Sequence, residues 1–245
     1  RRLRDVERSR GTQRERRVAS PALRVALAGY TNAGKSSLMN ALTGAGVSTE
    51  DALFETLDPT TRRLDCEGHE VLLSDTVGFI RHLPHQLVKA FSATLEEVRD
   101  ADLILHVADA SEPETRRAGR ARAVDEVLED IGAGDVPHQL VLNKVDLLGP
   151  DDREALVNRS PGAILVSATT GEGLDGLLHH LADAARRRLT RVELTIPYDR
   201  GNLIAAIYTD GSEIEQEATA DGTRVTALMP AGSAARLRAA LNGAP

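Results

Sequence analysis

A glycine-rich segment between an apolar run and a helical pattern carries the clearest chemistry in the sequence. Residues 29–36 are Gly-Tyr-Thr-Asn-Ala-Gly-Lys-Ser and match the G-x-x-x-x-G-K-[ST] pattern. Such glycines let backbone N–H groups surround a phosphate, and the start of the following helix adds its positive dipole end. Here Lys35 would contact the β- and γ-phosphates of a nucleotide, and the Ser36 hydroxyl would bind Mg²⁺. The predicted contacts in this P-loop are Asn32, Ala33, Gly34, Lys35, Ser36 and Ser37.

A second motif supplies a carboxylate for the same nucleotide. Residues 75–78 are Asp-Thr-Val-Gly and follow an apolar run typical of a strand. In a D-x-x-G motif of this kind, the Asp holds Mg²⁺ and the Gly N–H meets the γ-phosphate. We therefore expect Asp75 to hold Mg²⁺ through a water, and Gly78 to contact the γ-phosphate.

The polar segment between these motifs is expected to be a switch. Residues 47–63 contain four threonines. One threonine of a switch contributes its hydroxyl to Mg²⁺ and lies beside the γ-phosphate. The pattern does not choose among Thr56, Thr60 and Thr61, and the others would be turn or strand-entry residues.

Two further segments indicate which base is bound. Residues 143–146 are Asn-Lys-Val-Asp and follow another apolar run. The Asp146 carboxylate can accept hydrogen bonds from guanine N1–H and the N2 amine, donors that adenine does not present together. A site with such an acceptor rejects a ligand that leaves it unpaired. Ser167 and Ala168 follow the next apolar run and would place a backbone N–H near guanine O6. The motif residues Asn143, Lys144 and Asp146 thus predict GTP rather than ATP.

The position that usually orients the attacking water carries an unsuitable side chain. Many related domains have a Gln after D-x-x-G, and this sequence has Phe79. A phenyl ring cannot orient water by a conventional hydrogen bond, so we expect slow intrinsic hydrolysis and stimulation by a partner. Asn32 could help to coordinate a potassium ion between the α- and γ-phosphates, or it could only brace the loop. The predicted catalytic contributions come from Lys35, Thr56, Gly78 and Asn32.

The elements that must position these residues follow an α/β rhythm. Short apolar runs alternate with longer amphipathic ones, which favours a mostly parallel sheet. The pair Glu67-Gly68 is a hairpin signal, so one strand should be antiparallel. The expected strands are 23–28, 62–66, 71–74, 103–108, 139–142 and 164–166. The expected helices are 35–43, 87–99, 113–131, 151–159 and 173–189.

The pattern changes near residue 190 and predicts a second unit. Residues 192–245 suggest a small α+β domain with the order β-α-β-β-α. The expected organisation is an N-terminal helix (1–19), a G domain with a mixed six-stranded sheet (20–190) and a C-terminal domain (191–245). The chain begins without Met in an arginine-rich stretch, so we interpret it as part of a longer protein whose preceding domain ends in this helix.

Charge and composition narrow the functional classes. Residues 1–20 carry eight Arg and three acidic residues, against a net charge of −7 for the 245-residue chain. This basic arm could contact nucleic acid, or it could be a solvated helix face. No apolar run is long enough to span a membrane. One cysteine excludes an internal disulfide and fits a cytoplasmic location. No histidine or cysteine spacing indicates a transition metal, and a monomer is expected.

Three stretches of the sequence resemble the HflX family of translation-associated GTPases. They are residues 29–36, residues 54–60 (Phe-Glu-Thr-Leu-Asp-Pro-Thr) and residues 75–84 (Asp-Thr-Val-Gly-Phe-Ile-Arg-His-Leu-Pro). The resemblance implies a GTPase that docks on the large ribosomal subunit and its RNA and promotes subunit dissociation. It also implies that Thr56 is the switch threonine on Mg²⁺ and that Phe54 lies at the nucleotide.

Family members carry a large N-terminal domain, of which residues 1–18 could supply only the last helix. This chain could therefore hydrolyse GTP without dissociating ribosomes.

Two alternative functions stay open. A potassium-dependent GTPase of ribosome assembly or tRNA modification is one alternative. The tail at residues 79–84 and an end without cysteine argue against it. A nucleotide-gated binding module with incidental hydrolysis is the other, and Phe79 keeps it open.

Overall fold

The computed structural model describes residues 22–44, 60–76, 78–79 and 92–243. The predicted helix over residues 1–19 lies outside these ranges, as does most of the predicted switch. The described chain forms two compact units. Of the described residues, the larger unit holds those between 23 and 67 and between 71 and 181. The smaller unit holds residues 182–243 together with Ala22 and residues 68–70. Each unit contains its own sheet.

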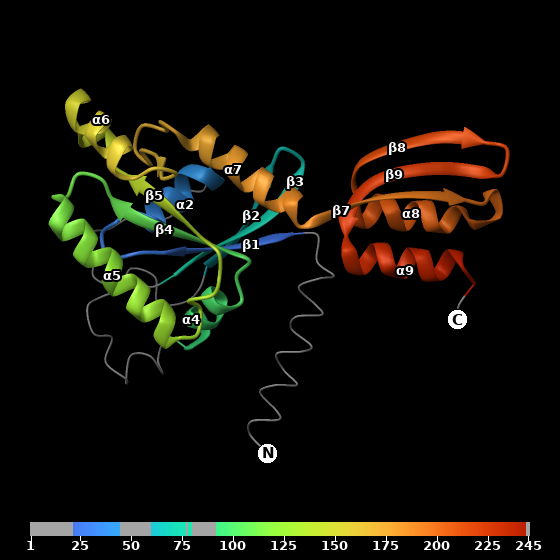
Figure 1. Cartoon of the computed structure of the whole chain (residues 1–245), viewed down its shortest axis with the longest axis horizontal. Helices are drawn as coiled ribbons and strands as arrows, with labels where there is room; N and C mark the ends of the chain where they lie inside the picture. Colours follow the sequence, from blue (N-terminus) through green and yellow to red (C-terminus); the bar gives the residue numbers. More distant parts are fainter. Residues whose placement is uncertain (1–21, 45–59, 77, 80–91, 244–245) are drawn as a thin grey trace, which may run out of the picture. The chain divides into compact units, whose positions relative to one another are not determined.

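The larger unit is built on a six-stranded sheet of order β2-β3-β1-β4-β5-β6 (Figure 1). Strand β1 lies in the middle, parallel to β3 on one side and to β4 on the other. Strands β2 and β3 are joined by a turn at Glu67 and Gly68, whose φ angles are 54° and 82°. A two-residue turn of this kind joins antiparallel strands, so the sheet is mixed. The strands are β1 (Leu23–Ala28), β2 (Thr60–Cys66), β3 (His69–Asp75), β4 (Leu103–Asp109), β5 (His138–Asn143) and β6 (Ile164–Leu165).

Burial on both faces explains why strand β1 is apolar except at Arg24. In β1, Leu23, Val25 and Leu27 alternate with Ala26 and Ala28, and all five are buried. Parallel strands covered by helices on both faces have no solvent side that would require polar residues. The predicted nucleotide-binding motifs therefore lie where these buried runs end.

In the described residues of this part of the chain there are five α-helices, and the last of them continues past residue 181. They are α2 (Lys35–Thr43), α4 (Ser92–Arg99), α5 (Glu114–Asp130), α6 (Pro150–Arg159) and α7 (Leu174–Arg187). Leu95 and Val98 of α4 pack with Val124 of α5 in one core cluster on β1 and β4. Figure 1 shows α2 on the opposite side of the sheet from α5. The sheet thus carries helices on both faces.

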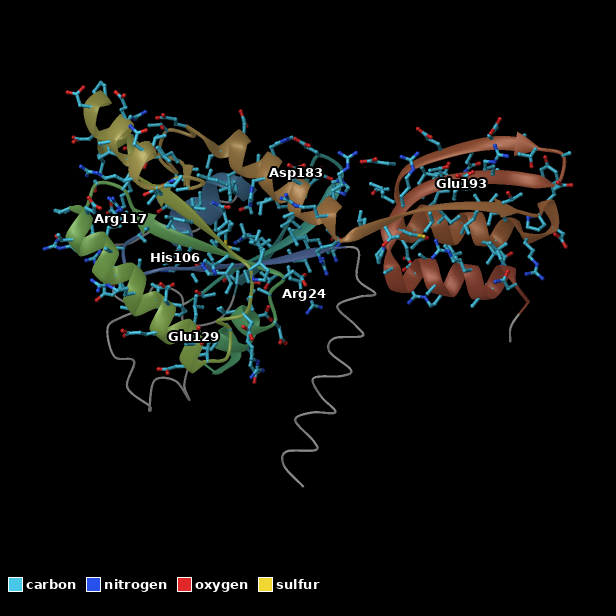
Figure 2. The ribbon with its side chains drawn as sticks, in the orientation of Figure 1. Arg24, His106, Arg117, Glu129, Asp183 and Glu193 are labelled. Carbon is cyan, nitrogen blue, oxygen red and sulfur yellow. The ribbon has the colours of Figure 1, made fainter. Side chains whose placement is uncertain are left out.

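His106 illustrates how β4 meets α5. It lies on the sheet in Figure 2, and it is 6 % exposed. Its Nδ1 is 4.0 Å from Oδ1 of Asp125 on α5. Burial lowers the pKa of His106 despite the nearby carboxylate, because a buried charge is poorly solvated. His106 is therefore a neutral core residue at ordinary pH.

The smaller unit has the element order β7-α8-β8-β9-α9. Its three-stranded antiparallel sheet has the order β7-β9-β8. Helices α8 and α9 contribute Ile207 and Leu237 to a core that includes Val225 and Met229 of β9. The bounds are β7 (Leu189–Ile196), a short 3₁₀ turn (Tyr198–Arg200), α8 (Gly201–Asp210), β8 (Ser212–Thr219), β9 (Gly222–Pro230) and α9 (Ala231–Leu241).

The predicted fold class is confirmed: an α/β unit with a mixed, mostly parallel six-stranded sheet, and a small α+β unit. The helix expected over residues 87–99 is described from Ser92 onwards, and its first part lies outside the described residues. In the described ranges, none of the helices has both the length and the apolar character to cross a membrane.

Candidate nucleotide-binding site

The P-loop connects β1 to α2 through two residues with left-handed backbone. Asn32 has φ 62° and Gly34 has φ 88°. A Cβ on Gly34 would lie 2.3 Å from Nδ2 of Asn143, so the close approach of these two segments requires glycine. Helix α2 then starts at Lys35, and Leu38 N donates to Gly34 O at 2.8 Å as its first backbone bond.

Hydrogen bonds from the Asn-Lys-Val-Asp motif fix the direction of the P-loop peptides. Asn143 Nδ2 donates to Ala33 O at 3.0 Å and to Gly34 O at 3.5 Å. The C=O and N–H of a trans peptide point in opposite directions. The N–H groups of Gly34 and Lys35, which share these peptide planes, therefore face away from Asn143. This is the orientation that a phosphate cradle needs.

Lys35 is held inside the loop. Its side chain is largely buried, and Nζ donates to Gly29 O at 3.2 Å and to Tyr30 O at 3.3 Å. A buried ammonium needs such acceptors, because leaving water costs it several kcal/mol. The geometry keeps the positive charge within the loop, where a bound polyphosphate would replace the two carbonyls as the partner of the ammonium.

Ser36 and Asp75 bring two hard oxygen ligands together. Ser36 Oγ donates to Asp75 Oδ2 at 2.7 Å, and Asp75 is 3 % exposed. The parallel register places Leu27 beside Asp75, which aligns the ends of β1 and β3. Mg²⁺ prefers oxygen ligands and usually binds one or two carboxylates together with phosphates. The pair therefore fits a magnesium ion that is shared with a nucleotide.

The segments predicted to recognise guanine form one network. Asp146 lies in a 3₁₀ turn (Val145–Leu147) after β5, and its Oδ1 accepts from Ser167 Oγ at 2.6 Å. Ala168 N donates to Asn143 Oδ1 at 3.0 Å. The N–H that we assigned to guanine O6 is thus engaged by Asn143 in this structure. The hydrogen bonds join the two base-recognition loops to each other.

Phe79 does not face the nucleotide side of the loop. Its side chain is completely buried in the cluster that contains Val98 and Ile104. Its backbone pairs with the P-loop instead: Phe79 N donates to Gly29 O at 3.0 Å and Thr31 N donates to Phe79 O at 3.2 Å. Phe79 therefore anchors the D-x-x-G segment to both the core and the P-loop.

Gly78 is constrained by the same pairing. A Cβ on Gly78 would lie 2.6 Å from Cγ2 of Thr31. Any larger residue would push the D-x-x-G segment away from the P-loop. Glycine is therefore favoured at residue 78 for a steric reason as well as for its predicted contact with the γ-phosphate.

Sequence reasoning missed Asp109, which lies at the end of β4. Lys144 Nζ donates to its Oδ2 at 2.7 Å. Burial alone would raise the pKa of Asp109, but the hydrogen bonds from Lys144 and Ser111 outweigh it and hold the pKa below the usual value. The sequence signal for Asp109 was its position at the end of an apolar run. The carboxyl ends of parallel strands meet at one edge of the sheet, so a polar residue there lies close to the other motifs.

The predicted switch residues are only partly described. Phe54 and Thr56 lie outside the described residues. Thr60 and Thr61 begin β2, and the Thr61 hydroxyl lies 2.8 Å from that of Ser74. The predicted site residues that the structure brings together are Asn32, Ala33, Gly34, Lys35, Ser36, Asp75, Asn143, Lys144, Asp146, Ser167 and Ala168. Ser37 lies in the first turn of α2.

The ordered motifs on this sheet define a G domain of the P-loop class. Residues 24–144 match the family model described as 50S ribosome-binding GTPase, and residues 154–241 match the HflX C-terminal domain. The chain belongs to the HflX family of GTPases.

Curated relatives carry the same family name, and a solved GTP-binding protein has a similar fold. The chain is 47 % identical to GTPase HflX of Magnetococcus marinus, over 94 % of this chain and 53 % of that protein. It is 44 % identical to GTPase HflX of Escherichia coli, over 84 % of this chain and 49 % of that protein. The chain thus spans about half the length of these relatives. A GTP-binding protein from Sulfolobus solfataricus, solved in complex with GDP, is 28 % identical with a TM-score of 0.51, covering 76 % of this chain and 58 % of that one.

Proposed function

We propose that this chain binds GTP with Mg²⁺ and hydrolyses it to GDP and phosphate. The observation that carries the proposal is one hydrogen-bonded network across three strand ends. Asn143 and Lys144 hold the P-loop carbonyls, and Ser36 holds Asp75. Membership of a GTPase family supports the same conclusion.

Each side chain has a distinct role in this proposal. Lys35 neutralises the β- and γ-phosphates as a compact charge. Asp146, braced by Ser167, accepts from the guanine edge. Bound Mg²⁺ would be held by Ser36, Thr56 and, through water, Asp75, and would supply charge neutralisation at the phosphates.

Hydrolysis in the isolated chain is expected to be slow. The Phe79 ring is buried, so residue 79 offers no group to orient water. Asn32 is exposed in the P-loop, and its backbone oxygen is held by Lys144 at 2.8 Å. This leaves the Asn32 side chain as a candidate potassium ligand, and a bound cation there would stabilise charge that develops on the phosphates.

We further propose that the protein associates with the large ribosomal subunit in the cytoplasm and promotes subunit dissociation. The description of the family model that matches residues 24–144 names 50S binding, and the sequence resemblance points the same way. The basic residues 1–20 suit contact with RNA. In this proposal residues 20–190 act as the G domain, residues 191–245 form a separate domain, and the protein works as a monomer.

The test is a GTP hydrolysis assay with and without purified large subunits, run in KCl and in NaCl at equal ionic strength. We expect stimulation of at least about tenfold by the subunits and faster turnover in KCl, because both would supply the stabilisation that residue 79 lacks. The longer protein is assayed in parallel, since this chain spans about half of its relatives.

Each outcome separates a different part of the proposal. Full-speed turnover without subunits would contradict the account of Phe79. GTP binding with no stimulation in either protein would favour a nucleotide-gated binding module. Equal rates in KCl and NaCl would assign Asn32 to bracing the loop. A light-scattering assay of subunit dissociation then tests the ribosomal step itself.

A further inference from the structure

A partly buried carboxylate at the end of β4 is connected to both halves of the proposed nucleotide site. The Asp109 side chain is 11 % exposed. Its Oδ1 accepts from Ser111 N at 2.9 Å and from Ser111 Oγ at 2.6 Å. Its Oδ2 accepts from Lys144 Nζ at 2.7 Å. Both oxygens are thus committed, and the carboxylate is fixed in one orientation.

Lys144 passes this restraint to the P-loop. The same Nζ donates to Asn32 O at 2.8 Å. One ammonium therefore joins the end of β4, the loop after β5 and the P-loop. Lys144 and Asn32 both have left-handed backbone, with φ 68° and 62°. Such a conformation is unfavourable for a non-glycine residue, so it needs support from its surroundings.

We propose that Asp109 is a positioning residue that couples guanine recognition to the phosphate grip through Lys144. This inference deepens the proposed function and rests on it. Asp109 holds the Lys144 ammonium, Lys144 holds the Asn32 carbonyl, and the P-loop keeps the peptide orientation described above. Asp109 itself does not touch the nucleotide.

The electrostatics give Asp109 a second effect. A bound triphosphate is a polyanion that attracts any mobile ammonium nearby. Lys35 is the cation of the cradle, whereas Lys144 belongs to the base-recognition motif. A charge-assisted bond to Asp109 keeps Lys144 on the base side of the loop, because such bonds are about twice as strong as neutral ones.

The choice of lysine at this position is informative. The chain contains three lysines among its 30 basic residues. A compact ammonium can donate to a carbonyl and a carboxylate at once, whereas the planar guanidinium of Arg fixes the directions of its donors. Lys144 uses this freedom to donate to the Asn32 carbonyl and the Asp109 carboxylate.

The first test is the rate of GDP dissociation from the Asp109→Asn variant. Asn keeps the shape but removes the charge. We expect release about tenfold faster than from the wild type, which corresponds to the loss of one charge-assisted hydrogen bond. Asp210→Asn is the matched control: its carboxylate also accepts from a serine hydroxyl and an Arg, but in the smaller unit. It should release GDP at the wild-type rate.

A double-mutant cycle tests whether the effect runs through Lys144. Once Lys144→Met has removed the ammonium, Asp109→Asn should accelerate release by less than about twofold more. A full additional tenfold effect in the Lys144→Met background would overturn the proposal, because Asp109 would then act by another route. A thermal shift without any change in GDP release would assign Asp109 a merely structural role and would also overturn it.

A second readout needs no nucleotide. We would acylate the nucleotide-free protein with an N-hydroxysuccinimide ester and measure modified Lys144 by mass spectrometry, against an added lysine peptide. An ammonium held by two acceptors should react more slowly than the reference, and Asp109→Asn should accelerate the reaction about fivefold. Unchanged Lys144 reactivity would refute the link. If the wild type bound no GDP while this readout behaved as expected, the proposed function would fail and the link would stand.

Discussion

Phe79 occupies the chain position at which many G domains carry a water-orienting glutamine. Its ring is fully buried among Ala28, Val98 and Ile104, while its backbone pairs with Gly29. A side chain in that direction enters the apolar core instead of the loop that we propose binds the phosphates. The absence of a catalytic group at residue 79 is therefore a property of the backbone direction as well as of the phenyl ring.

Replacing Phe79 by Gln should not create a catalytic residue. The amide would enter an apolar core, so we expect the free energy of unfolding to fall by about 3–5 kcal/mol, with no gain in intrinsic hydrolysis. Urea unfolding and single-turnover GTP hydrolysis measure the two effects. Phe79→Leu is the control and should cost less, because it keeps the site apolar. A Gln variant with wild-type stability and faster hydrolysis would disprove this account.

At the residue scale, the sequence motifs predicted those residues whose spacing along the chain is set by the shape of a bound nucleotide. Lys35 and Asp146 could be singled out because their neighbours in the chain carry part of the same motif. Asp109 belongs to no motif, and its role depends on β4 and β5 ending side by side, which only the folded sheet shows. For Phe79, the sequence showed the missing hydrogen-bonding group but not the direction of the ring.

The β2–β3 hairpin places the single cysteine of the chain in a poor environment for a thiolate. Cys66 ends β2 and is 1 % exposed. Burial, followed by the neighbouring Asp65 and Glu67 carboxylates, raises the pKa of Cys66 to about 11 from the ordinary 9.0. Each of these causes disfavours the charged form. The thiol should thus stay protonated in the folded chain at pH values where it ionises in the unfolded chain.

This difference makes a pH-dependent prediction. Between pH 9 and 11 the unfolded chain releases the Cys66 proton and the folded chain keeps it, so stability falls as the pH rises. The full effect would be about 2–3 kcal/mol, at 1.36 kcal/mol for each pKa unit. Urea unfolding of the wild type and Cys66→Ala at pH 8 and pH 10.5 measures it. Other titrating groups are common to both proteins, so an identical loss in both would refute the prediction.

At the element scale, the ends of helices and strands were predicted correctly where particular residues in the local sequence terminate them. Strand β1 and helix α2 have the predicted ends, because Gly34 and Gly44 take left-handed φ angles on either side of α2. Strand β6 has two residues instead of the predicted three. Its length is set by pairing with β5, where Leu142 faces Leu165 as the last pair. The length of β6 is thus determined by its partner strand and could not be predicted from the residues of β6 alone.

For the whole molecule, the family and the fold follow from the motifs and from the two sheets. The matched families cover residues 24–144 and 154–241, while the chain spans about half of its curated relatives. The alternation of apolar and amphipathic runs, and its change near residue 190, were enough to predict the two kinds of fold, because each unit has its own core. Ribosome contact depends on surfaces that a nucleotide motif does not encode, so it needs the assay with large subunits.

The central claim is that Asp146 selects guanine while Lys35 and the P-loop amides grip the phosphates. Isothermal titration calorimetry of the same protein with GDP and with ADP, each with Mg²⁺, tests it most directly. We predict clear binding of GDP and an affinity for ADP about 10⁴-fold lower, since adenine would leave the carboxylate unpaired. Equal affinities for the two nucleotides, or binding of neither, would contradict the claim.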